Sequence, residues 1–168
     1  MNGFQNAETV SLWIIGFGNR HRRDDGIGPH VTERLKSRFG DAGGVNVVSL
    51  HQLVPELAED LRTATGVFFI DAAQGPLSGG CSWSKVRPVS DMHRIVHSLT
   101  ANALLGLTQL LYNRCPPAWM VSVQGNDFSF GEGLSQVAAD NADLATGEIS
   151  RVIHCELFTT TFTQGLSA

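Results

Sequence analysis

The chain has 168 residues, of which 42% are hydrophobic and 17% charged. This composition is typical of one globular domain, so we expect a single domain over residues 1–168, with a core from about 11 to 154 and frayed termini. The formal net charge of −4 excludes the basic footprint of a nucleic-acid-binding domain. No membrane span or secretory signal is predicted, and the three widely spaced cysteines are expected to be reduced packing residues, which favours the cytoplasm.

Apolar runs that suit buried strands alternate with capped or amphipathic segments that suit helices. The expected strands are 12–15, 45–50, 66–71, 81–87 and 119–123, and the expected helices are 26–39, 55–61, 100–112 and 135–154. This alternation predicts an α/β fold of three layers, a mostly parallel five-stranded sheet with helices on both faces. The looser pattern of 81–87 indicates an edge strand that can run antiparallel.

The first strand leads into a short glycine-containing loop and then into two adjacent acids. Gly16 and Gly18 allow close backbone approaches that a Cβ would block. Asp24 and Asp25 then precede the helical pattern that begins near Gly26. The acids are therefore expected at the carboxyl edge of the sheet, where open α/β folds bind their ligands.

The same stretch argues against a dinucleotide site. His21 stands where a dinucleotide fingerprint needs its third glycine, and the strand 45–50 is followed by His51 rather than an acid. Two carboxylates at a helix start also repel a pyrophosphate but attract a cation.

Three ligand-type side chains recur next to predicted strands and helices: Asp25 after the first strand, Asp71 at the end of the third, and His97 before the third helix. In a doubly wound sheet Asp25 and Asp71 face one crevice. Two carboxylates and an imidazole suit a divalent transition metal ion better than calcium. Each residue also has a simpler interpretation: Asp25 as a helix N-terminal acid, Asp71 as a turn cap and His97 as a surface loop residue.

Five ordered segments, within about Leu12 to Ile153, resemble motifs of the hydrogenase maturation endopeptidases. They are Ile14–Gly28 (I-I-G-F-G-N…D-D-G-I-G), Gln52–Leu57, Ile70–Ala72 (I-D-A), His97–Leu105 and Gln124–Ser135 (Q-G…F-G-E-G-L-S). This resemblance implies an aspartyl-type endopeptidase that removes a C-terminal peptide from the nickel-loaded precursor of a nickel–iron hydrogenase large subunit. Nickel supplied by that precursor would be contacted by Asp25, Asp71 and His97, and other divalent ions can substitute in the free protein.

The resemblance implies that the partner is the precursor. We expect a monomer, and the charge and hydropathy of the chain predict that no nucleic acid or membrane is involved. Aspartate at position 25 replaces the glutamate common in the family, which shortens the reach by one methylene and keeps an oxygen donor. His93 competes with His97 as the histidine ligand, and Asp24 is a candidate base or a supporting partner of the metal-contacting residues.

Two rival functions remain: a non-catalytic nickel-sensing escort of the hydrogenase large subunit, and a small metal-dependent hydrolase. The basic run 20–23 is either a solvated loop or a contact for an acidic partner, with the solvated loop favoured.

Overall fold

The computed structural model describes residues 10–89 and 99–165, with side chains described as far as Cys155. Its five strands form one sheet in the order β2-β1-β3-β5-β4. The strands are β1 (Leu12–Phe17), β2 (Val45–Leu50), β3 (Gly66–Gln74), β4 (Cys81–Val86) and β5 (Ala118–Gly125). All neighbouring pairs are parallel except β4 and β5, so the mostly parallel sheet with an antiparallel edge is confirmed.

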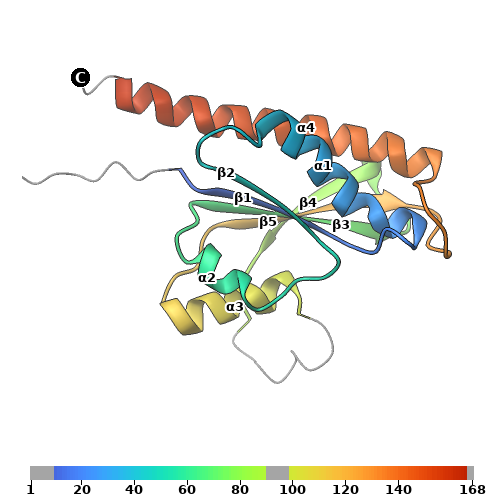
Figure 1. The fold of residues 1–168 in the computed structure, drawn as a ribbon, viewed down its shortest axis with the longest axis horizontal. Helices are drawn as coiled ribbons and strands as arrows, with labels where there is room; N and C mark the ends of the chain where they lie inside the picture. Colours follow the sequence, from blue (N-terminus) through green and yellow to red (C-terminus); the bar gives the residue numbers. More distant parts are fainter. Residues whose placement is uncertain (1–9, 90–98, 166–168) are drawn as a thin grey trace, which may run out of the picture.

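Helices cover both faces of the sheet (Figure 1). Long helices lie on one face, α1 (Ile27–Phe39) and α4 (Gln136–Gly165), and shorter helices lie on the other, α2 (Leu57–Leu61) and α3 (Ala101–Tyr112). Two 3-10 turns, η1 (Arg23–Gly26) and η2 (Ser78–Gly80), complete the described elements. None of the helices in the described part of the chain is long and apolar enough to span a membrane.

β1, β3, β5 and α4 run further than predicted, and the extensions of β3 and α4 have clear physical reasons. β3 continues past Asp71 because β5 still pairs with it as far as Gln74, opposite Gly125, although its pairing with β1 ends at Ile70. α4 continues to Gly165, through the polar segment where we expected a frayed tail. No proline or glycine interrupts residues 148–164, and extending an existing helix is much easier than starting one.

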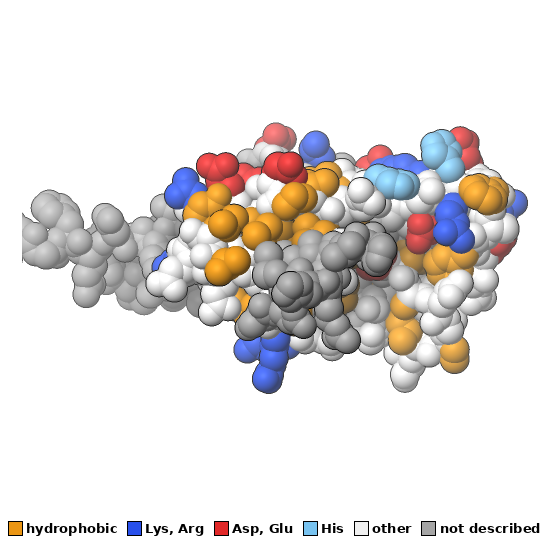
Figure 2. All heavy atoms as spheres, turned by 90° about the horizontal axis from the view of Figure 1, so that it is seen from below, with side chains coloured by type: hydrophobic (Ala, Val, Ile, Leu, Met, Phe, Trp, Pro, Cys, Tyr) orange, Lys and Arg blue, Asp and Glu red, His pale blue; other side chains and the backbone are white. Residues whose placement is uncertain are grey.

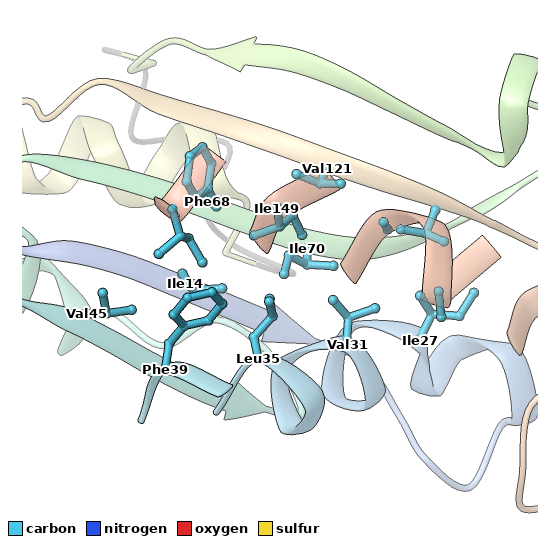
Figure 3. Packing of buried hydrophobic residues seen from close by; sticks show 14 of the residues in the cluster. Ile14, Ile27, Val31, Leu35, Phe39, Val45, Phe68, Ile70, Val121 and Ile149 are labelled. Carbon is cyan, nitrogen blue, oxygen red and sulfur yellow. The ribbon is translucent and has the colours of Figure 1, made fainter. Parts of the chain in front are cut away.

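The cores on the two faces follow the alternation of each strand. Phe68 and Ile70 pack on the α1–α4 side, among the residues drawn in Figure 3, whereas Val67 and Phe69 pack on the α2–α3 side. Ala72 packs against the α1–α4 core. Asp71 lies between Ile70 and Ala72 on β3, so its side chain points to the opposite face of the sheet, the α2–α3 side.

The two ends of the α2–α3 face differ in character. Apolar side chains gather over α3, where Leu110 and Leu111 are exposed, and charged, histidine and apolar side chains mix at the end where the parallel strands finish (Figure 2).

The start of α1 lies directly on the sheet, with no layer of side chains between them. A Cβ at Gly28 would come within 2.4 Å of the Phe17 carbonyl oxygen and 2.6 Å of the Ile70 carbonyl oxygen. A Cβ at Gly16 would lie 2.3 Å from the carbonyl oxygen of Gly28. Only glycine permits this contact, which brings the residues before α1 to the ends of β1 and β3.

Gly28→Ala is therefore expected to destabilise the protein by about 3 kcal/mol, the upper end for overpacking, because the obstructing atoms are backbone atoms. Gly43→Ala is the matched control, since a methyl group at that position would meet nothing within 4 Å. Urea unfolding of both variants measures the difference. Equal stability of the two variants would contradict the close packing.

Candidate functional site

Asp25 is held in the turn between β1 and α1. Its Oδ2 accepts a hydrogen bond from the backbone N–H of Asn19 at 2.9 Å. Gly18 has a φ of +140°, and a Cβ there would lie 1.9 Å from the Asp25 carbonyl oxygen. The loop after β1 thus holds Asp25 through one hydrogen bond and one close backbone contact. The second carboxylate oxygen, Oδ1, accepts no hydrogen bond from the described residues.

Asp71 lies on β3 at the point where β1 stops pairing with it. Its Oδ1 accepts a hydrogen bond from the N–H of Ala72 at 2.9 Å. Burial raises the pKa of Asp71 to about 6, and the nearby negative charge of Asp25 adds to the rise, although the Ala72 hydrogen bond opposes it. Asp25 is thus near enough to Asp71 for its negative charge to act on the Asp71 carboxyl, and joint ionisation of two such neighbours is unfavourable without a cation.

The third predicted ligand, His97, and its competitor His93 lie outside the described residues. Thr100, just after them, caps α3, accepting a hydrogen bond from the N–H of Ala103 at 3.2 Å. α3 covers the face of the sheet to which Asp71 belongs. Within residues 10–89 and 99–155, no group of three or more His, Cys, Asp or Glu side chains can hold a metal ion. The metal-binding role of Asp25, Asp71 and His97 therefore stays a prediction.

Asp24 has a different task from its neighbour. Its buried carboxylate accepts hydrogen bonds from the N–H groups of Asn126, Asp127 and Ser135 and from the Ser135 hydroxyl, all at 2.7–2.8 Å. Burial acts to raise the pKa of Asp24, but these hydrogen bonds together hold it below its usual value. A carboxylate so fully engaged is a poor proton acceptor, so the hypothesis that Asp24 is a base is wrong.

The function of Asp24 is to join distant parts of the chain at the carboxyl edge. It connects the turn before α1 to the loop 126–135 that follows β5, and through Ser135 to the start of α4. Sequence reasoning missed this role because the partners are 102–111 residues away and nothing local to Asp24 marks them.

The basic run 20–23 is largely neutralised within the chain. Arg20 pairs with Glu33 at 2.7 Å, Arg23 with Asp127 at 3.3 Å, and His21 lies 3.7 Å from Glu132. The arginine–acid pairs thus help to hold the loop and helix around the site, so the run is more than the solvated loop that the sequence favours.

The cysteines and the amino edge contribute nothing to this site. Cys81 packs against the core as predicted, but Cys115 and Cys155 are exposed, so the packing interpretation is wrong for those two. A hollow of about 760 Å³ lies at the opposite, amino edge of the sheet, lined by residues 62–65 and 113–117 without a carboxylate.

Asp24→Asn is expected to lower the free energy of unfolding at pH 7 by about 3 kcal/mol, because an amide nitrogen then faces buried N–H donors. Since the folded-state pKa of Asp24 is lowered, its contribution is fully present above the unfolded value of 3.8 and is lost as the pH falls from there through the lower folded-state pKa. Urea unfolding at several pH values checks this, with exposed Asp140→Asn on α4 as control. A variant as stable as the control would contradict the assignment.

Asp71→Asn is expected to have the opposite effect. The folded-state pKa of about 6 exceeds the unfolded value of 3.8, so the wild-type protein loses stability as the pH rises through this interval. One unit of pKa difference corresponds to about 1.4 kcal/mol, so the free energy of unfolding of the variant should exceed that of the wild type by roughly 1–3 kcal/mol at pH 7.5 and by little at pH 4. Metal-free unfolding curves measure this, and a destabilised variant at pH 7.5 would contradict the buried, repelled carboxylate.

Comparison with known proteins shows which fold surrounds this pair. No family model and no curated protein sequence matches the chain. Among solved structures, the hydrogenase maturating endopeptidase HybD from E. coli superposes with a TM-score of 0.70 at 15% identity, over 88% of this chain and 94% of that one. The [NiFe] hydrogenase maturation protease HycI from Thermococcus kodakarensis gives 0.66 at 18% identity, over 90% and 96%.

A third structure, the hydrogenase 2 maturation peptidase from Thaumarchaeota archaeon SCGC_AB-539-E09, gives a TM-score of 0.64 at 21% identity, over 86% of this chain and 98% of that one. At these identities the likeness concerns the fold. The resemblance first indicated by five short motifs is thereby confirmed at the level of architecture: the chain has the fold of the hydrogenase maturation endopeptidases.

Proposed function

We propose that this protein is an endopeptidase that removes a C-terminal peptide from the nickel-loaded precursor of a nickel–iron hydrogenase large subunit. The observation that carries the proposal is the pair Asp25 and Asp71, brought together at the carboxyl edge of a sheet that has the fold of such peptidases. These are the positions onto which the motif resemblance maps metal contacts.

The chemistry of the pair suits a cation delivered by the substrate. Two carboxylates that raise each other's energy when both are ionised gain most from a divalent ion placed between them. Nickel in the precursor would be held by Asp25 and Asp71, with His97 as the predicted third donor, and supplies Lewis acidity toward a carbonyl group or a water molecule. The protein's own residues bind and orient the precursor's metal centre.

Neither Cys81 nor Cys115 is suited to act as a nucleophile. Cys81 donates to Glu148 at 3.4 Å, and burial together with that carboxylate raises the pKa of its thiol to about 11. Burial also raises the pKa of Cys115. Neither thiol is activated as a cysteine protease requires, which favours hydrolysis assisted by the substrate's metal.

The test is a processing assay with purified protein and a hydrogenase large-subunit precursor, nickel-loaded or nickel-free, read by mass spectrometry. The released C-terminal peptide is expected only from the nickel-loaded precursor. Asp25→Ala and Asp71→Ala should lower release at least 100-fold, as expected when a transition-state contact is lost. Asp143→Ala, which removes an exposed acid paired with Arg34, is the control.

Equal release from nickel-free precursor, or full processing by either site variant, would refute the proposal. A tight complex without cleavage would instead favour the escort. His97→Ala and His93→Ala, compared in the same assay, assign the third ligand.

A further inference from the structure

Phe130 is the most exposed of the large apolar side chains described, with 86% of its surface accessible. It lies in the loop 126–135 after β5, at the carboxyl edge that also carries Asp25 and Asp71. A single exposed apolar residue is ordinary on a protein surface. The backbone around Phe130, however, is unusually well fixed.

Hydrogen bonds fasten the chain on both sides of Phe130 to the turn before α1. On one side the N–H of Asp24 donates to the carbonyl of Asp127 at 3.0 Å. On the other side, the N–H of Arg23 donates to the carbonyl of Gly131 at 3.0 Å. The N–H of Gly131 in turn donates to the carbonyl of His21 at 2.9 Å. The ring is thus presented to solvent by a preorganised loop, which lowers the entropy lost when a partner binds it.

Arg22 adds a positive charge beside the ring. Its guanidinium carbon lies 6.0 Å from the centroid of Phe130, and its Nε and Nη2 both donate to the carbonyl of Phe128, at 3.3 and 3.2 Å. Arg20 and Arg23 are paired with acids, but Arg22 has no carboxylate partner among residues 10–89 and 99–155. Its charge is therefore available to an external carboxylate.

A hollow of about 490 Å³ borders the same loop. It is lined by Arg20, His21 and His30 on one side and by Glu132, Leu134 and Ala139 on the other. An exposed ring next to a hollow with an apolar wall is a shape that a protein partner can bind. Aromatic and arginine side chains commonly contribute most of the binding energy at protein–protein interfaces.

We propose that Phe130 and Arg22 form a docking contact for the precursor, which binds there through a segment that carries an apolar side chain next to a carboxylate. This inference rests on the proposed function, because it takes the hydrogenase precursor as the partner. The contact uses side chains other than those of Asp25 and Asp71, and it determines affinity for the partner instead of the chemistry of cleavage.

The test measures the affinity of the full-length protein for nickel-free precursor by isothermal titration calorimetry, so that no turnover occurs. Phe130→Ala is expected to weaken binding about 30-fold, as at an interface hot spot, and Phe130→Leu should recover most of it. Arg22→Gln should weaken binding about 5-fold and flatten its salt dependence, whereas Arg22→Lys keeps that dependence. Leu144→Ala, on α4 with 56% exposure, is the matched control.

Unchanged melting temperatures show that the variants fold, as the exposure of Phe130 leads us to expect. Phe130→Ala with the affinity of Leu144→Ala would overturn the inference even if the precursor is processed. Loss of binding in Phe130→Ala, with no cleavage of any precursor by the wild-type protein, would uphold the docking contact while refuting the peptidase. Self-association of the wild-type protein that Phe130→Ala abolishes, without an effect on precursor binding, would overturn it in favour of a second copy.

Discussion

The close contact between the start of α1 and the sheet is the constraint on which the site depends. With glycine at position 28, the helix backbone lies directly against the carbonyl oxygens of Phe17, the last residue of β1, and Ile70, the last residue of β3 that pairs with β1. A larger residue would lift the helix and carry Asp25, three residues before it, away from Asp71. The carboxylate pair is therefore a consequence of backbone packing, and the rest of the edge is built around that placement.

The adjacent acids Asp24 and Asp25 have different roles at this edge because their surroundings differ. The carboxylate of Asp24 is enclosed by four donors and is stabilised as an anion. Asp25 accepts one recorded hydrogen bond and lies close enough to Asp71 to raise its pKa. Asp24 supplies stability, whereas ionised Asp71 holds unfavourable charge that a cation would relieve, a division often found where a protein gives up stability for function.

The same edge organises the loop that carries Phe130. Asp24 and the turn residues before it hold the loop 126–135, so one hydrogen-bond network connects the turn that carries Asp25 to the loop that carries Phe130. In the function we propose, a docking contact and a metal-binding pair held on one frame would let precursor binding and nickel recognition act together.

Short apolar or alternating runs were enough to predict the strands and the antiparallel edge. The hydrophobicity pattern of each segment reflects whether one or both of its faces are buried. Asp25 could be located because glycines before and after it mark a tight strand–helix turn. The role of Asp24, the pairing of Arg23 with Asp127 and the extension of β3 to Gln74 could not be predicted. Each depends on a partner from the β5 region, and nothing in the local pattern identifies that partner.

The central claim is that Asp25 and Asp71 form one side of a metal-reading site, and a crystal soaked in millimolar Ni²⁺ tests it most directly. Anomalous scattering at the nickel edge is predicted to show a peak within about 2.2 Å of a carboxylate oxygen from each residue, with an imidazole nitrogen as a further ligand. A peak that is absent from this pair but present elsewhere on the protein would contradict the account.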